Sequence, residues 1–207
     1  VTEFQGGWFG QVGGLMSEEQ DGIDHLQINA LTMNALAHGI TGINYYMLFG
    51  GTNVGDWGGQ GILTTYDYFA PIREWGGGGA KYHVVRNIGH FLQEFGPELA
   101  RSVREPSLDA TGSAVVVARK AASGGLYAFV HNPSRSAGVQ ATVKVGEKPV
   151  ILNLGPFDYK VVRLAPGSQP QIFPRPVPAM SPPVLPVPIR LKNAEFVTLA
   201  PTGWQDC

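Results

Sequence analysis

The residues best suited to chemistry stand at the start of the chain. Glu3 ends a short run of β-prone residues, Gly6-Gly7 allows a tight bend because glycine has no Cβ, and Trp8 follows at once. A carboxylate can act as a nucleophile, a general acid or a general base. A lone glutamate near a terminus is more often simply a solvated surface side chain. We interpret Glu3 as a candidate nucleophile held at a strand end beside an aromatic wall, and the rest of the chain must support this.

Aromatic side chains accompany the carboxylate in two later stretches. Tyr45-Tyr46 lies in an apolar run, and residues 64–71 carry Tyr66 and Tyr68. Aromatic rings cover the apolar face of a pyranose and carboxylates do the bond-breaking work, so the set is typical of a sugar site; the alternative is that the rings fill a core. Because neighbours on a strand point to opposite faces, only one of Tyr45 and Tyr46 can face such a site.

Other chemistries find no support in the sequence. The Gly-rich residues 50–55 lack the Lys-Ser/Thr of a P-loop, the histidines are scattered, and no Gly-x-Ser-x-Gly occurs. We therefore expect no metal and no cofactor. The net charge of -1 gives no reason to expect a nucleic-acid partner, and no apolar run is long enough for a membrane span.

Two amphipathic stretches and one apolar run predict the elements that position these residues. A helix is expected between a cap at Asp21 or Asp24 and Gly39, and a second helix over 81–95 is expected to end at Gly96-Pro97. The apolar run 42–49 predicts a strand buried on both faces. Strand, helix and strand together predict a βαβ unit with a right-handed crossover.

The hydrophobic period changes to two beyond residue 113, which predicts an antiparallel β-sandwich domain. Residues 166–188 contain nine prolines, as expected of an extended linker, and residues 189–207 resemble the first strand of a further, incomplete β domain. The strands expected in the β domain are 113–120, 125–132, 139–145, 150–154 and 159–164.

Four motifs, in this order and spacing, resemble the β-galactosidases of glycoside hydrolase family 35. They are Thr-Glu-Phe-Gln-Gly-Gly-Trp-Phe at 2–9, Asn-Tyr-Tyr-Met-Leu-Phe-Gly-Gly-Thr-Asn at 44–53, Thr-Tyr-Asp-Tyr-Phe-Ala-Pro at 65–71, and Lys81-Tyr82. The resemblance covers roughly residues 1–95. Phe69 stands where the family commonly has an acidic residue, and residues 48–51 vary on the commoner pattern, so the sugar or aglycone preference stays open.

The resemblance implies a site and a role for each of its residues. Glu3 matches the nucleophile at the end of strand seven of a TIM (β/α)8 barrel, and Tyr46 matches the strand-eight tyrosine beside it. Trp8 and Tyr68 match residues of the sugar pocket, and we interpret Asp67 as a structural brace of its loop.

The resemblance also implies the organisation of the chain. Residues 1–100 would be the C-terminal portion of the catalytic barrel, strands seven and eight with their helices, and 101–165 the β domain. The Pro-rich linker 166–188 and the incomplete domain 189–207 would follow.

The expected activity is that of a retaining exo-glycoside hydrolase. It would release terminal β-D-galactose from a β-galactoside oligosaccharide or glycoconjugate by double displacement, without a cofactor. The resemblance favours a secreted, periplasmic or lysosomal location. Two alternatives stay open: a non-catalytic carbohydrate-binding relative, and a glycosidase of the same clan that acts on another β-linked sugar.

One expected group is absent from the sequence. A retaining glycosidase needs two carboxyl groups about 5 to 5.5 Å apart. In the family the acid/base glutamate follows an asparagine at the end of strand four, and no Asn-Glu dipeptide occurs here. Strands one to six would precede Val1. We therefore expect a fragment that requires a missing N-terminal barrel segment and is inactive alone.

Overall fold

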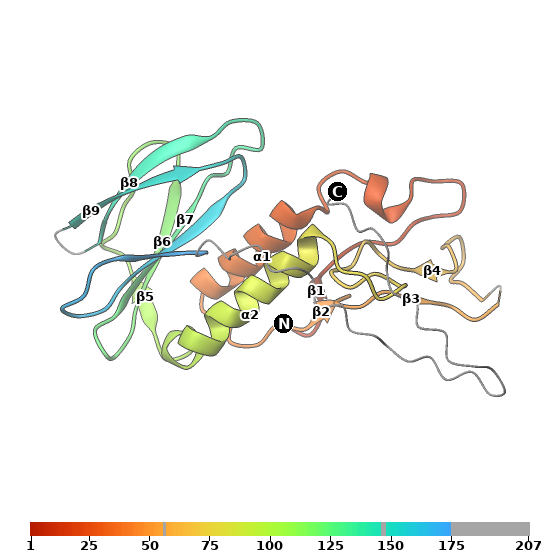
Figure 1. The fold of residues 1–207 in the computed structure, drawn as a ribbon, viewed down its shortest axis with the longest axis horizontal. Coiled ribbons are helices and arrows are strands. Elements are labelled where there is room, and N and C mark those ends of the chain that lie inside the picture. Colours follow the sequence, from red (N-terminus) through yellow and green to blue (C-terminus); the bar gives the residue numbers. More distant parts are fainter. Residues whose placement is uncertain (56, 146–147, 175–207) are drawn as a thin grey trace, which may run out of the picture. The chain divides into compact units, whose positions relative to one another are not determined.

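The computed structural model describes residues 1–55, 57–145 and 148–174. Two long helices and a set of mostly antiparallel strands make up this part of the chain (Figure 1). The elements, in chain order, are β1 (Phe4–Gln5), the 3-10 turn η1 (Ser17–Glu19), α1 (His25–Ala37), β2 (Tyr45–Tyr46), β3 (Gly51–Thr52), β4 (Thr65–Tyr66), α2 (Ala80–Leu99), β5 (Val103–Glu105), β6 (Val115–Lys120), β7 (Leu126–His131), β8 (Val139–Val145), β9 (Lys148–Leu154), β10 (Tyr159–Leu164) and β11 (Gln171–Phe173).

Helix α1 connects two parallel strands, as the sequence predicts for a βαβ unit. The Asp24 carboxylate caps the helix by accepting a hydrogen bond from the Gln27 N–H at 2.8 Å. Past the other end, Gly39 has φ +88°, a conformation that favours glycine. Strand β2 then returns beside β1 in parallel, with Phe4 opposite Tyr45 and Gln5 opposite Tyr46.

The strand predicted over 42–49 is much shorter in the structure, where β2 holds two residues. Its backbone bonds continue a little further: the Asn44 N–H donates to the Val1 carbonyl at 3.1 Å, and the Gly6 N–H donates to the Tyr46 carbonyl at 2.9 Å. Among the described residues, β1 and β2 each pair with one neighbour only. Because β2 pairs on one side only, few backbone hydrogen bonds are available to extend the strand along its apolar run.

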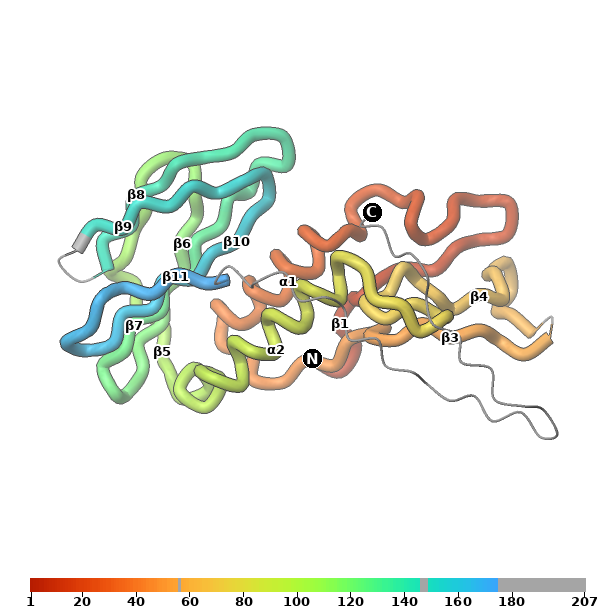
Figure 2. The backbone as a smooth tube through the Cα atoms, in the orientation of Figure 1, coloured from red at the N-terminus to blue at the C-terminus, as the bar shows by residue number. Residues whose placement is uncertain are grey.

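Helix α2 runs past the expected stop. It spans Ala80–Leu99 with Pro97 inside its last turn, so the prediction that Gly96-Pro97 ends the helix is wrong. Proline deletes its own N–H bond and crowds the carbonyl four residues earlier. Neither effect blocks the next turn, because the Ala100 N–H still donates to the Gly96 carbonyl at 2.9 Å. Figures 1 and 2 both show α2 lying beside α1.

The C-terminal half is antiparallel, as its alternating pattern predicts. Five strands form one sheet in the order β11-β10-β7-β6-β5, and β8 and β9 form a separate hairpin (Figure 2). Strand β7 alternates between two cores. Tyr127 and Phe129 belong to the core shared with the helices, while Ala128 and Val130 pack with the hairpin. The sheet is therefore covered by helices on one face and by the hairpin on the other.

Strand β11 lies inside the stretch for which the sequence predicts an extended linker. Its residues pair antiparallel with β10, and Phe173 is buried in the helix-facing core. The triplet Gln171–Phe173 contains no proline, so its backbone can still donate to a ladder. The expected linker residues 175–188 and the expected further domain at 189–207 lie outside the described residues.

A buried arginine ties the sheet to both helices. Arg119 on β6 donates to the Ser102 hydroxyl at 2.7 Å and to the Ser102 carbonyl, just past the end of α2. It also donates to the Ala37 carbonyl at 3.3 Å, at the end of α1. A cation is well placed there, because the C-terminal end of a helix carries partial negative charge.

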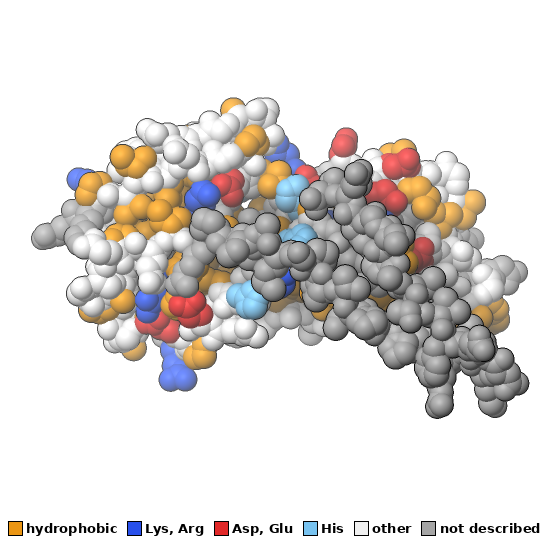
Figure 3. Space-filling view, in the orientation of Figure 1, with side chains coloured by type: hydrophobic (Ala, Val, Ile, Leu, Met, Phe, Trp, Pro, Cys, Tyr) orange, Lys and Arg blue, Asp and Glu red, His pale blue; other side chains and the backbone are white. Residues whose placement is uncertain are grey.

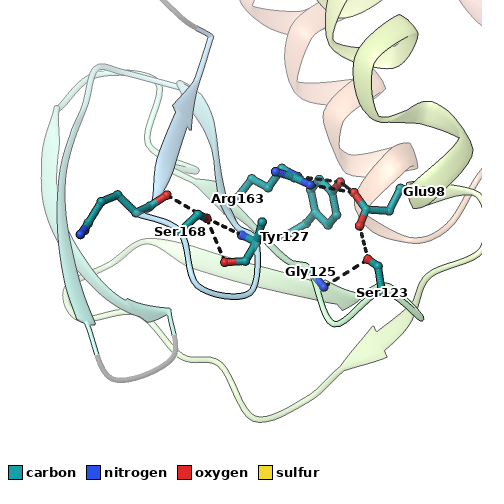
Figure 4. Close-up of polar contacts among 8 residues, drawn as sticks. Glu98, Ser123, Gly125, Tyr127, Arg163 and Ser168 are labelled. Atoms are coloured by element: carbon teal, nitrogen blue, oxygen red, sulfur yellow. Dashed lines mark hydrogen bonds and ion pairs between the residues drawn. The ribbon is translucent and has the colours of Figure 1, made fainter.

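A second polar cluster joins the end of α2 to the sheet. Figure 4 shows the Glu98 carboxylate directed toward the hydroxyls of Ser123 and Tyr127 and the guanidinium of Arg163, which lies 3.1 Å away. Partial burial by itself would raise the pKa of Glu98, but the hydrogen bonds from these three groups outweigh it and hold the pKa below its usual value. The charged carboxylate therefore stabilises the folded chain.

Replacing Glu98 by glutamine is expected to lower the free energy of unfolding at neutral pH by about 1–2 kcal/mol, because charge-assisted hydrogen bonds are lost. A lowered folded-state pKa means that this stabilisation is present above the usual value of 4.5 and is lost as the pH falls through the folded-state pKa. Urea unfolding of both chains at neutral and acidic pH measures the difference, which must shrink in acid.

The matched control for that experiment is Glu19→Gln. Glu19 belongs to an exposed turn, where its carboxylate accepts a hydrogen bond from the Met16 N–H at 2.9 Å. An amide oxygen can accept the same bond, so we expect a change below about 0.5 kcal/mol. Equal effects at Glu98 and Glu19 would contradict the stabilising role of the Glu98 cluster.

Candidate functional site

Glu3 lies on the ladder between β1 and β2. Its side chain is exposed. The backbone hydrogen bonds that pair the two segments involve Val1 before Glu3 and Phe4 and Gly6 after it. The assigned strand β1 begins one residue after Glu3, whereas the sequence places Glu3 at a strand end. The parallel partner offers carbonyls at Asn44 and Tyr46, so the pairing continues beyond the acid.

The glycine pair is required by close approach of other backbones. A Cβ at Gly6 would collide with the Met47 carbonyl, and a Cβ at Gly7 would collide with the Tyr68 carbonyl. Neither glycine has a positive φ. The pair therefore lets the residues after Glu3 lie directly against the segments that carry the tyrosines, rather than permitting a left-handed turn.

The two adjacent tyrosines point to opposite sides of β2. The Tyr45 hydroxyl meets the Thr32 hydroxyl of α1 at 2.8 Å, and its ring packs edge-on against Phe4. Tyr46 is 39% exposed and packs edge-on against Tyr68, with 5.9 Å between ring centroids. Tyr46 thus lies with the aromatic cluster and Tyr45 with the helix layer.

Three tyrosines, Tyr46, Tyr66 and Tyr68, form a cluster beside Glu3. Tyr66 and Tyr68 stack with ring centroids 4.8 Å apart. Burial raises the pKa of Tyr46, and the neighbouring Tyr66 and the negative charge of Glu3 raise it further. Burial first, then the other two tyrosines, raises the pKa of Tyr68 strongly. The hydroxyls of Tyr46 and Tyr68 therefore stay protonated at neutral pH and are available as donors to a carboxylate or a sugar oxygen.

The loop that carries Tyr68 is held by a buried ion pair. Asp67 is bound to Arg73 at 2.5 Å and also accepts the Glu74 N–H at 2.8 Å. Tyr68 and the following Phe69 both have positive φ, 56° and 52°. Bulky residues adopt this conformation only when the surroundings impose it, and such strain is typical of functional loops. The structure is consistent with the interpretation of Asp67 as a brace.

Trp8 lies at the rim of the tyrosine cluster. It is 46% exposed and stacks on Phe9 with 4.9 Å between ring centroids. Its backbone N–H donates to the Tyr68 carbonyl at 2.9 Å, and Phe9 in turn contacts the Tyr68 ring. An exposed indole whose backbone is bonded to the Tyr68 carbonyl offers a flat apolar face to a ligand.

Two residues of the site were given no role by the sequence. Arg73 pairs with Asp67 and lies over the Phe69 ring at 5.0 Å. Lys81, at the start of α2, is buried and donates to the Gly6 carbonyl at 3.1 Å. Both residues lie far from Glu3 in the sequence, so the sequence alone did not associate them with the site. Lys81 belongs to the Lys81-Tyr82 motif but received no role from it, and Arg73 lies in no recognised motif.

Two other carboxylates in the segments that carry the tyrosines are bound to protein groups. Asp67 binds Arg73, and Glu74 accepts the hydroxyls of Thr52 and Thr65 at 2.8 and 2.9 Å. Glu3 is the acid beside this cluster that is left exposed. The described residues hold no group of three His, Cys, Asp or Glu side chains suited to a metal ion. The arrangement can therefore supply one nucleophilic carboxylate, tyrosine donors and an aromatic wall.

The charge distribution and the helices of the described residues bear on other classes of partner. On the face drawn in Figure 3, acidic and basic side chains are scattered between polar and hydrophobic ones rather than gathered into one charged region. A single-sign patch of the kind that attracts nucleic acid is not visible among the described residues on that face. No helix in the described part of the chain is both long and apolar enough to cross a bilayer.

Comparison with known proteins gives a match over the residues that form this site. The model of glycosyl hydrolases family 35 matches residues 1–92. A probable β-galactosidase B of Pyrenophora tritici-repentis is 37% identical over 95 residues, 44% of this chain and 9% of the relative. A probable β-galactosidase B of Sclerotinia sclerotiorum is 28% identical over 143 residues, 69% of this chain and 13% of the relative.

A third relative agrees, and all three are far longer than the matched region. β-Galactosidase A of Aspergillus oryzae is 41% identical over 75 residues, 36% of this chain and 8% of the relative. The chain spans about a tenth of the length of the curated relatives that it matches. Residues 1–92, which carry Glu3 and the tyrosine cluster, are thus similar to glycosyl hydrolases family 35, and the chain is similar to proteins named β-galactosidase.

Proposed function

We propose that this chain forms part of a retaining exo-glycoside hydrolase that releases terminal β-D-galactose from β-galactosides. The observation that carries the proposal is the pairing of β1 with β2, which brings the exposed Glu3 and the protonated Tyr46 together in the segment matched by the family. A carboxylate beside a hydroxyl donor and an aromatic wall suits attack on a sugar ring.

In the first step, a carboxylate oxygen of Glu3 attacks the anomeric carbon and forms a glycosyl ester. The bond from that carbon to the aglycone oxygen breaks, and a second carboxyl group donates its proton to the departing oxygen. In the second step, that group takes a proton from water while the water oxygen attacks the anomeric carbon. The ester bond breaks, Glu3 returns as a carboxylate, and galactose leaves with its original configuration.

The other site residues bind and orient. Tyr46 is assigned a hydrogen bond to a Glu3 carboxylate oxygen, which directs the carboxylate at the anomeric carbon. Trp8 supplies a flat wall for the apolar face of the pyranose, and the buried Tyr68 hydroxyl donates to a sugar oxygen. Asp67 holds the loop in which Tyr68 lies.

The second carboxyl group is assigned to a missing N-terminal barrel segment. Among the described acids, Asp67 and Glu74 near the tyrosines are bound to other protein groups. We assign β1, α1 and β2 to the seventh and eighth units of a TIM barrel, residues 101–165 to a β-sandwich domain, and 166–188 to a linker. We call residues 1–207 joined to the proposed barrel strands one to six the longer polypeptide.

The purified 207-residue chain is expected to hydrolyse no methyl β-galactoside, whose leaving oxygen must be protonated, above the background rate. Without a proton donor, departure of the aglycone from an unactivated β-galactoside meets a large barrier, and general acid catalysis alone is worth about 10²–10⁴-fold. Release of galactose is followed by an enzyme-coupled absorbance assay. Steady turnover by this chain would contradict the proposal that the acid/base group lies elsewhere.

The longer polypeptide tests the reaction itself. With a β-galactoside as substrate, proton NMR should detect the β anomer of galactose first, before mutarotation mixes the anomers. The α anomer first would contradict a retaining mechanism. Binding of galactose without turnover would support the non-catalytic relative, and turnover of another β-linked sugar alone would support the same-clan alternative.

A further inference from the structure

Lys81 is an unusual group in this part of the chain. It stands one residue inside the start of α2 and is 3% exposed. Its ammonium group donates to the Gly6 carbonyl at 3.1 Å and lies 4.5 Å from the centroid of the Phe69 ring. A lysine is almost never fully buried unless its charge is compensated. In the residues that the structure describes, Lys81 has no ion-pair partner within 4.0 Å.

The two contacts of Lys81 join the two halves of the proposed site. Gly6 follows Glu3 by three residues, and its own N–H donates to the Tyr46 carbonyl. Phe69 follows Tyr68 in the strained part of the loop. A single ammonium group therefore contacts the backbone just beyond the carboxylate and the ring just beyond the sugar-binding tyrosine.

The surroundings of Lys81 do not favour its charge. Burial lowers the pKa of Lys81 to about 8; Arg73 lowers it as well, while Asp24 and Asp67 raise it. Asp24 caps α1 and Asp67 is bound to Arg73, so neither carboxylate is free to pair with the lysine. A buried charge without an ion pair weakens the fold more often than it strengthens it. A role in stability therefore does not explain this side chain.

We infer that Lys81 is a positioning residue, which fixes the Glu3–Gly6 segment against the Tyr68–Phe69 loop through its bonds to the Gly6 carbonyl and the Phe69 ring. The lysine touches neither of the reacting groups. It sets the distance between the carboxylate and the tyrosines that aim it and hold the sugar. The inference rests on the proposed function for its catalytic consequence, but the geometric part can be measured without any activity.

The geometric part is tested by amide hydrogen exchange in the 207-residue chain. The Gly6 and Trp8 amides report on the site, because they donate to the Tyr46 and Tyr68 carbonyls. In Lys81→Met we expect at least a tenfold loss of protection at both amides, with an unchanged or higher melting temperature. The control is Lys144→Met, which removes an exposed lysine on β8 and should leave both amides protected.

The unaltered chain supplies a second measurement that needs no variant. As the pH rises through about 8, Lys81 becomes neutral, and the protection factors of the Gly6 and Trp8 amides should fall. In Lys81→Met they should not change with pH over that range. Protection that is independent of pH in the unaltered chain, or equal in Lys81→Met, would overturn the inference.

The catalytic part is tested in the longer polypeptide. A misplacement of about 1 Å can cost on the order of 100-fold in rate, so Lys81→Met should lower kcat about 100-fold while KM changes less. A variant as active as the unaltered enzyme would overturn the catalytic consequence. If the unaltered enzyme itself is inactive, the proposed function fails, and the exchange experiment still decides whether Lys81 positions the segment.

Discussion

Replacing Glu3 by glutamine is expected to lower kcat for β-galactoside hydrolysis by the longer polypeptide on the order of 10⁵-fold. The amide has nearly the shape of the carboxylate but cannot form the glycosyl ester, and loss of a nucleophile is among the largest single effects in enzymes. Because Glu3 is exposed, the free energy of unfolding should change by less than about 0.5 kcal/mol. Initial rates and urea unfolding measure the two quantities.

The control for the Glu3 experiment is again Glu19→Gln. Both residues are exposed glutamates of the N-terminal region, and Glu19 bonds to the backbone of its own turn. Activity of Glu19→Gln should stay within about twofold of the unaltered enzyme. Retention of more than about a hundredth of the activity in Glu3→Gln would remove Glu3 as the nucleophile.

Replacing Asp67 by alanine is expected to destabilise the 65–74 loop by about 3–5 kcal/mol, because the change leaves Arg73 with an unpaired, largely buried charge. Glu18 lies 3.4 Å from Arg73 but is more exposed, so it compensates little. The Glu74 N–H also loses its acceptor. Hydrogen exchange at the Glu74 amide measures the local free energy of opening, and urea unfolding measures the global one.

The Asp67 substitution should also affect the site. Tyr68 and Phe69 hold positive φ only while their loop is fixed, so the Tyr68 ring should leave the tyrosine cluster when the brace is lost. Asp109→Ala is the matched control, because Asp109 is exposed and accepts a hydrogen bond from the Ala110 N–H. An Asp67→Ala chain with the exchange pattern of the Asp109→Ala chain would show that the ion pair does not hold the loop.

Much of the fold could be predicted from local patterns. The apolar spacing and a cap at Asp21 or Asp24 predict α1, and the structure selects Asp24; alternation predicts strands that the structure contains as β6 to β10. These signals act within a few residues, so the sequence contains them in full. The stop at Gly96-Pro97 failed because a proline in the last turn leaves the following hydrogen bond intact.

Long-range pairing was harder to predict. The length of β2 depends on which neighbour it pairs with, and its apolar run gives no hint that only two residues are assigned to the strand. Strand β11 lies among prolines, and its three residues form a strand only because β10 offers an edge. Tertiary contacts, and not local propensity, determine the length of β2 and the formation of β11.

The site divides in the same way. The resemblance to glycoside hydrolase family 35 identified Glu3, Trp8, Tyr46 and Tyr68 as candidates, and the ring centroids of Tyr46 and Tyr68 lie 5.9 Å apart in the structure. The residues that support the site, such as Lys81, could not be identified from motifs, because Lys81 contacts Gly6 from 75 residues away in the chain. Their contacts depend on the fold, while their residue types are common on any surface.

The most direct test of the proposed nucleophile is covalent labelling of the longer polypeptide. A 2-deoxy-2-fluoro-galactosyl inactivator forms the glycosyl ester but slows its hydrolysis, so mass spectrometry of the digested protein can locate the sugar. We expect the label on Glu3, in the peptide that precedes the Gly6-Gly7 pair. A label on any other carboxylate, or none in an enzyme that hydrolyses β-galactosides, would contradict the assignment of Glu3 as nucleophile.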